Sequence, residues 1–242
     1  MPLPTFGTAG AASPTLAPAT DRPRCRTCVF KHECLPAELE GAELAVFERA
    51  VSRQVRPIRE GQVLVRQGNA MNGLYTLRVG ALKAVIDTAD GSERVVGFRF
   101  PGAVIGLAEP EHDGWARTFI ALEDSWLCRI PLEAIDGTVH RQLVRLMSQR
   151  LRREYTFHLA LAFRTSAEKV IEFLLDISES HRHRRLAADR FTLPMSFIEI
   201  ASYLGMRHES VSRTLSDLQR RGLIAHEGRR FAIPSLEALR AF

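Results

Sequence analysis

The spacing of apolar positions divides the chain into helical and strand-like stretches. In residues 36–56 the apolar side chains recur near helical spacing with charged residues between them, and they are Leu39, Leu44, Val46, Phe47 and Val51. This pattern predicts an amphipathic helix. From Pro57 to about residue 131, short runs rich in Val, Ile, Leu and Phe take over, separated by glycine-containing turns.

Six of these runs predict strands, namely Val63–Val65, Leu74–Leu77, Ala81–Ile86, Arg94–Phe100, Thr118–Leu122 and Trp126–Ile130. Asp90-Gly91 lies between two of them and predicts a tight hairpin. Several short strands with glycine turns at this spacing are typical of a small antiparallel barrel or roll. We therefore expect a β-roll of the size of a sensor domain.

After Gly137 the pattern stays helical for about 25 residues. Alternating steps of three and four residues define one seam, made of Val144, Met147, Leu151, Glu154, His158 and Leu161. Such a seam predicts a long helix that pairs with its own copy in a homodimer. If Glu154 met its counterpart across the two-fold axis, like charges would weaken the dimer and make it easy to switch. The alternative is an offset seam in which Glu154 faces solvent.

The C-terminal stretch has the features of a helix-turn-helix. Thr165 with Glu168 and Ser196 with Glu199 are capping-box pairs that predict two helix starts. A small residue, a turn glycine and a branched apolar residue follow, and they are Ala201, Gly205 and Val211. Arg221–Ile224 and Phe231–Ile233, joined through Gly228, predict the two strands of a wing.

A basic stretch, His181–Arg185, lies between the predicted helices. Two histidines there indicate a metal site only weakly. We interpret the stretch as a solvated loop.

The charge of the chain is unevenly distributed. Residues 138–242 contain 18 Arg or Lys against 11 Asp or Glu, a net charge of +7, whereas residues 1–137 have a net charge of −2. A basic C-terminal half favours an anionic polymer as its target, although a solvated basic face would look the same. No apolar run is long enough for a membrane span and no export signal is evident, so we expect a cytoplasmic protein without a membrane partner.

Three of the four cysteines lie within ten residues, with C-x2-C-x5-C spacing at Cys25, Cys28 and Cys34, and the fourth is Cys128. In a reducing compartment, grouped thiols are more typical of soft-metal ligands than of disulfides. Taken alone, Cys128 is equally well explained as a buried thiol in a strand. Its combination with the other three favours a four-thiolate site.

The second helix of a helix-turn-helix inserts its N-terminal end into the major groove. That end carries His208, Glu209, Ser212 and Arg213, preceded by Arg207. Arg213 can donate two hydrogen bonds to guanine, and Glu209 can accept one from cytosine N4, so the pair would read a G·C base pair. The alternative is an ion pair within the helix on a solvated face. Arg207, Arg220 and Arg221 are better suited to phosphate or solvent.

The β-roll, the long helix and the Glu-Ser-Val-Ser-Arg recognition segment (209–213) together resemble the Crp/Fnr superfamily of bacterial transcription regulators. The cysteine pattern resembles its oxygen-responsive Fnr branch. The resemblance covers about Cys25 to the C-terminus, and an acidic residue in the dimer helix is also a feature of that branch.

The resemblance implies that Cys25, Cys28, Cys34 and Cys128 bind a four-iron four-sulfur cluster. In that branch the cluster promotes dimerisation and binding to a TTGAT-like inverted repeat in double-stranded DNA, and oxygen dismantles it. RNA polymerase is the implied partner, through roll loops such as Ala89–Ser92. The cyclic-nucleotide branch uses an acidic residue and an Arg-Ser pair, whereas Gly106–Ala108 and Trp115–Thr118 lack them, so we expect no cyclic nucleotide.

The resulting prediction is an α+β protein with an antiparallel β-roll, a dimerisation helix and a C-terminal winged helix-turn-helix. We divide it into a disordered tail (1–23), a cysteine loop (24–35), a sensor domain (36–137), a dimerisation helix (138–163) and a DNA-binding domain (164–242).

We interpret the chain as an oxygen-sensing global transcription regulator. The alternative is a zinc- or thiol-based redox regulator of the same fold. An enzyme is not expected, since no nucleophile with a base, paired carboxylates or phosphate loop is evident.

Overall fold

A computed structural model describes residues 24–52, 55–107, 114–162 and 164–242. The predicted tail, 1–23, lies outside the described residues. The chain divides into two compact units, which meet in sequence between Glu154 and Tyr155. We describe each by itself, as the N-terminal unit (24–154) and the C-terminal unit (155–242). None of the described helices is both long enough and apolar enough to cross a membrane.

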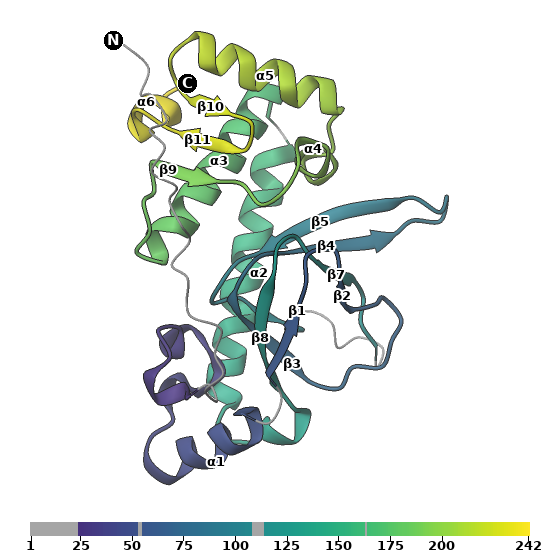
Figure 1. Ribbon diagram of the computed structural model, residues 1–242, viewed down its shortest axis with the longest axis vertical. Coiled ribbons are helices and arrows are strands. Elements are labelled where there is room, and N and C mark those ends of the chain that lie inside the picture. The colour runs from purple at the N-terminus through teal and green to yellow at the C-terminus, as the bar shows by residue number, and fades with distance from the viewer. Residues whose placement is uncertain (1–23, 53–54, 108–113, 163) are drawn as a thin grey trace. The chain divides into compact units, whose positions relative to one another are not determined.

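The N-terminal unit begins with three short 3-10 turns and a helix. The turns are η1 (Cys25–Thr27), η2 (Lys31–Glu33) and η3 (Leu35–Glu38), and the helix is α1 (Gly41–Ser52). Eight strands follow: β1 (Val55–Ile58), β2 (Val63–Val65), β3 (Leu74–Val79), β4 (Leu82–Asp87), β5 (Glu93–Arg99), β6 (Val104–Ile105), β7 (Thr118–Ala121) and β8 (Ser125–Ile130). A further 3-10 turn, η4 (Leu132–Ala134), leads to the long helix α2 (His140–Ala162) (Figure 1).

The strands form two antiparallel four-stranded sheets, ordered β1-β8-β3-β6 and β2-β7-β4-β5. This arrangement confirms the predicted roll. The Asp90-Gly91 hairpin is also confirmed, because β4 pairs with β5 from Leu82–Arg99 to Asp87–Glu93. Gly91 has a φ of 77°, a left-handed conformation that glycine adopts without strain.

Both faces of the first sheet are buried, and strand alternation separates its two cores. In β8, Leu127 packs inside the roll, whereas its neighbour Cys128 faces an outer cluster with α1. In β3, Tyr75 and Leu77 point into the roll and Leu74 joins the outer cluster. Because successive strand residues point to opposite faces, this alternation places Cys128 on the side of the cysteine turns.

Two predictions about this unit were wrong in detail. The predicted helix over 36–56 is α1 followed by strand β1, which begins at Val55 and pairs with β8. The short strand β6 was not predicted at all. It pairs with β3 through only two residues, so it leaves no periodic pattern in the sequence.

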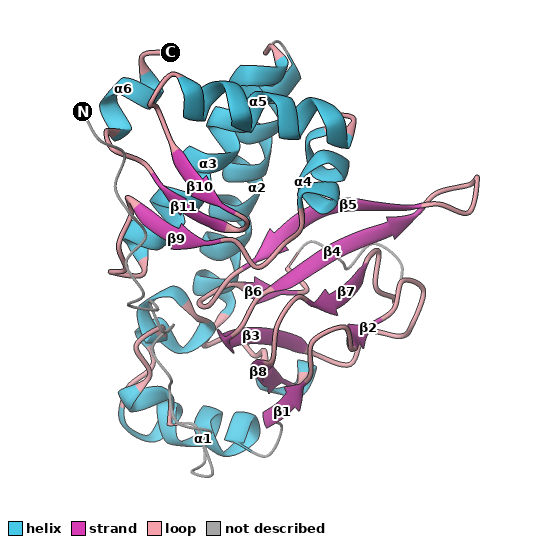
Figure 2. Ribbon diagram, turned by 45° about the horizontal axis from the view of Figure 1, so that its top comes forward, coloured by secondary structure: helices cyan, strands magenta, loops and turns pink. Residues whose placement is uncertain are grey.

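The C-terminal unit contains the end of α2 and the winged helix-turn-helix (Figure 2). Its elements are α3 (Ser166–His183), β9 (Arg190–Thr192), α4 (Phe197–Leu204), α5 (His208–Arg220), β10 (Ala225–Glu227), β11 (Arg230–Ala232) and α6 (Leu236–Arg240). The three strands form one antiparallel sheet, ordered β10-β11-β9.

The helix-turn-helix prediction is confirmed residue by residue. Both capping boxes are present, with Thr165 and Ser196 as the N-caps of α3 and α4. Gly205 ends α4 in a left-handed conformation, with a φ of 62°. Ala201 and Val211 are buried where α4 and α5 pack together.

Two predictions in this unit need correction. The first wing strand is β10, so it begins at Ala225 after the predicted Arg221–Ile224 segment, and the turn at Gly228 is as expected. The stretch predicted as a loop at His181 continues α3 to His183. Burial, and then the charge of Arg184, lowers the pKa of His181 to about 4, and its ring packs beside Phe191 at 5.3 Å.

Candidate functional site

The cysteine turns are held together by backbone hydrogen bonds over very short distances in sequence. Cys25 starts η1, and the N–H of Cys28 donates to the Cys25 carbonyl at 3.2 Å. Cys34 ends η2 and precedes η3, where its carbonyl accepts from the N–H of Ala37. The N–H of Arg26 donates to Glu48 of α1 at 2.7 Å, which attaches the first turn to the helix.

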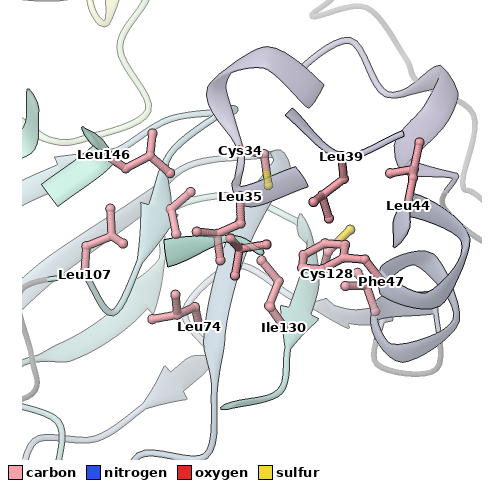
Figure 3. Packing of buried hydrophobic residues seen from close by; sticks show 13 residues of the cluster. Cys34, Leu35, Leu39, Leu44, Phe47, Leu74, Leu107, Cys128, Ile130 and Leu146 are labelled. Carbon is pink, nitrogen blue, oxygen red and sulfur yellow. The ribbon is translucent and has the colours of Figure 1, made fainter. Parts of the chain in front are cut away.

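Thr76 of β3 connects Cys34 with Cys128. Its hydroxyl lies 3.2 Å from the Cys34 sulfur, at hydrogen-bonding distance. Thr76 is also the direct cross-strand partner of Cys128 in the β3–β8 pairing. Cys34 and Cys128 are both buried in the outer cluster, where Cys25 packs as a partly buried member (Figure 3). The structure therefore brings the three N-terminal cysteines and the distant fourth into one region.

The pKa shifts of three of the thiols are consistent with this closeness. Burial raises the pKa of Cys25 to about 12, and the nearby Cys34 and Cys128 add to the effect. Burial likewise raises the pKa of Cys34 to about 11 and that of Cys128 to about 12, and Cys28 contributes to both. Thiolates this close repel one another, so a soft cation is needed to keep them deprotonated together.

The donor set fits a soft-metal centre, since four thiols are the usual ligands of iron–sulfur clusters and of many zinc sites. Within the described residues, no three His, Cys, Asp or Glu side chains already surround a point where a metal ion would fit. The residues are therefore gathered into one region without being arranged around a single ion.

The second feature is an apolar stripe along α2 that is exposed in the single chain. Its members are Val144, Met147, Leu151, Tyr155 and Leu159. Leu151 is the most exposed, at 69%. The first half of this stripe follows the predicted seam. In the second half, Tyr155 and Leu159 take the places that the prediction gave to Glu154 and His158, one residue earlier. The last predicted member, Leu161, is buried within the chain.

Glu154 is not directed to open solvent. It forms an ion pair with Arg150, one helical turn earlier, and its carboxylate lies 3.6 Å from the guanidinium of Arg99 on β5. Arg99 is only 4% exposed and also packs over the Phe119 ring. Burial alone would raise the pKa of Glu154, but Arg150 and Arg99 lower it below its ordinary value. Both ion pairs lie within one chain, and the register of the dimer seam stays a prediction.

The recognition residues lie on the first turns of α5. Glu209 and Arg213 are exposed and Ser212 is half-buried, and Glu209 lies 3.6 Å from His208. A hydrogen bond from its own backbone N–H lowers the pKa of Glu209 below its ordinary value, and His208 and then Arg213 lower it further. Arg207 is the exposed N-cap residue and makes no capping bond with its side chain.

Arg220 and Arg221 at the other end of α5 share one partner. Each lies 2.9 Å from Asp217, and Arg221 also stacks over the ring of Phe242. These ion pairs hold both guanidinium groups at the C-terminal end of α5.

Sequence analysis missed the residues that support these sites. Thr76 gave no signal, because a threonine in a strand is ordinary. Arg99 lies in the predicted strand Arg94–Phe100, and nothing in that run marks it as the partner of a residue on α2. Arg150 lies four residues before Glu154, which is the spacing of a helical ion pair and is a signal that sequence analysis could have used.

A β-roll with an attached helix and a winged helix-turn-helix define a class of DNA-binding transcription regulator. Comparison with known families agrees: residues 55–142 match the cyclic nucleotide-binding domain, and residues 168–242 match the Crp-like helix-turn-helix domain.

Full-length relatives identify the family. The chain is 34% identical to the transcriptional activator protein FnrA of Stutzerimonas stutzeri, over 86% of this chain and 88% of the relative. It is 30% identical to the fumarate and nitrate reduction regulatory protein of Salmonella typhi, over 90% of this chain and 89% of the relative. The structure of FixK2 from Bradyrhizobium japonicum matches with a TM-score of 0.68 and 26% identity, over 78% of this chain and 96% of that one. The protein belongs to the Crp/Fnr family of transcription regulators, which confirms the resemblance seen in its sequence.

Proposed function

We propose that this protein is an oxygen-responsive transcription regulator whose DNA binding depends on a four-iron four-sulfur cluster held by Cys25, Cys28, Cys34 and Cys128. The observation that carries the proposal is the position of Cys128. This residue of β8 lies opposite Thr76 in the sheet and in the same buried cluster as Cys34. The similarity to relatives named FnrA and anaerobic regulatory protein supports it.

In this proposal the chain's own residues perform three tasks. The four thiolates tie the N-terminal turns to β8, which fixes their position against α1 and the start of α2. The apolar stripe on α2 then pairs with that of a second copy, because apolar side chains on one helix face are buried by a partner. A bound iron–sulfur cluster would supply the sensitivity to oxygen.

The dimer presents two α5 helices to an inverted repeat in double-stranded DNA. We assign base reading to Glu209 and Arg213, with Ser212 and His208 beside them, and phosphate contact to Arg207. The TTGAT-like half-site, contact with RNA polymerase, a cytoplasmic location and the absence of cyclic-nucleotide binding remain predictions.

The test is an anaerobic purification followed by assays for iron and acid-labile sulfide, with a visible spectrum before and after exposure to air. We expect about four irons and four sulfides for each chain, and a visible absorption that air abolishes together with binding to a TTGAT inverted repeat. Cys128→Ala should lose the absorption although Cys25, Cys28 and Cys34 remain.

The zinc- or thiol-based alternative predicts a different result in the same experiment. Zinc bound by the four thiolates would give a colourless protein with no labile sulfide. A protein that contains zinc and no sulfide after strictly anaerobic preparation would therefore overturn the cluster proposal while leaving the family assignment intact.

A further inference from the structure

A buried hydrogen bond connects the long helix with the cysteine turns. Gln142, in the first turn of α2, is 3% exposed, and its Nε2 donates to the backbone carbonyl of Cys34 at 3.2 Å. The two residues are 108 positions apart in sequence. Both belong to the N-terminal unit.

The surroundings of Gln142 make it an unusual choice for packing alone. Val139, just before α2, and Leu143 and Leu146 within it pack on the outer cluster, which also contains Leu35. Figure 3 shows Leu146 and Leu35 in this cluster. Within the described residues, the Oε1 of Gln142 is buried and has no hydrogen-bond partner. A buried acceptor without a partner is costly, so an apolar side chain of similar shape would suit the cluster at least as well.

Cys34 makes hydrogen-bonding contacts through both its side chain and its backbone. Its sulfur contacts the Thr76 hydroxyl, and its carbonyl accepts from both Ala37 and Gln142. The backbone of Cys34 is therefore hydrogen-bonded directly to α2, so a ligand that shifts this backbone also shifts the group that Gln142 contacts. The unpartnered Oε1 also allows the Gln142 amide to accept a second bond from the turns after such a change.

We propose that Gln142 is a positioning residue that transmits the ligation state of Cys34 to α2 and so sets the strength of the dimer. This inference rests on the proposed function, because it requires a ligand at Cys34 and a dimer at the apolar stripe. Its hydrogen bond goes to the backbone carbonyl of Cys34 and not to the sulfur, so it acts through the backbone of Cys34.

The test compares the wild type with Gln142→Met, which keeps the length of the side chain and removes its amide. The dimer dissociation constant is measured by sedimentation, anaerobically, with and without the cluster. We expect the same iron, sulfide and visible spectrum in both proteins. The quantity to compare is the ratio of the dimer dissociation constant without the cluster to that with the cluster. This ratio should be about tenfold smaller in the variant than in the wild type. A residue that only stabilises the fold would change both dissociation constants alike and leave their ratio unchanged.

Gln149→Met is the matched control, since Gln149 lies two turns further along α2 and is exposed. It should keep the wild-type ratio. An unchanged ratio in Gln142→Met would overturn the inference. A wild type that takes up no iron or sulfide would overturn the proposed function itself, and this inference with it.

A second measurement does not depend on the variant folding. Hydrogen exchange of the wild type, at concentrations below the dimer dissociation constant, should show that cluster loading changes the protection of amides in residues 140–146. Equal protection in that segment with and without the cluster would count against Gln142 as the connection.

Discussion

The carboxylate of Glu154 on α2 lies 3.6 Å from the guanidinium of Arg99, which is buried on β5. Arg150 forms a second ion pair with the same carboxylate. A charge neutralised by two arginines of its own chain contributes little repulsion to a partner helix. These two ion pairs therefore predict that Glu154 adds little to the repulsion between two copies of α2.

Glu154→Gln should lower the free energy of unfolding of the cluster-free protein by about 2 kcal/mol, because it removes the carboxylate that pairs with the buried Arg99 and with Arg150. Chemical denaturation measures this, and Glu60→Gln, at an exposed position, should have little effect. We also expect Glu154→Gln and Glu154→Ala to remain monomeric in air. Sedimentation of an aerobic dimer would instead show that the two Glu154 side chains meet across the two-fold axis.

Leu151→Glu should abolish dimerisation, because it places a charge in the middle of the apolar stripe. We expect the dimer dissociation constant of the cluster-loaded protein to rise at least a hundredfold, corresponding to about 3 kcal/mol. Gln149→Glu adds the same charge to the same helix on its opposite side. If both variants weakened the dimer equally, the stripe would not be the interface.

Arg213→Ala should remove discrimination at the G·C pair of each half-site. Binding to the preferred sequence should weaken by about 1–3 kcal/mol, whereas binding to other sequences should not change. Arg207→Ala should weaken binding to all sequences alike and reduce the slope of affinity against salt by about one. Arg220→Ala should change binding less than either, since Asp217 holds that side chain. Titrations of matched and G·C-swapped duplexes at several salt concentrations separate these outcomes.

Acid should destabilise the C-terminal unit through His181. Its pKa is about 4 in the folded protein, lowered from 6.5, so the folded state favours the neutral ring. As the pH falls from about 6.5 to about 4, the unfolded chain binds the proton first and stability is lost, by about 3 kcal/mol at most.

Unfolding measured from pH 7 to pH 4 tests this, and His181→Gln should flatten the dependence. A pH dependence that survives in His181→Gln would assign the effect to another group.

The sequence alone was enough for the features that depend on local chemistry. Both capping boxes, the Gly205 turn and the Asp90-Gly91 hairpin follow from hydrogen-bonding groups or backbone conformations specified within a few residues. The wing was placed less accurately, because its strands are three residues long and give little periodicity.

The tertiary structure decided which side chains face one another. The period of α2 places Glu154 near the edge of the apolar stripe, and only the packing of β5 supplies Arg99 as its partner. Strand alternation explains why Cys128 faces outward, but the proximity of Thr76 and Cys34 depends on how the turns fold over the sheet. The Gln142 contact was invisible in the sequence, because a spacing of 108 residues carries no local signal. Periodicity fixes the direction of a side chain along its own element, whereas its partner is determined only when distant elements pack together.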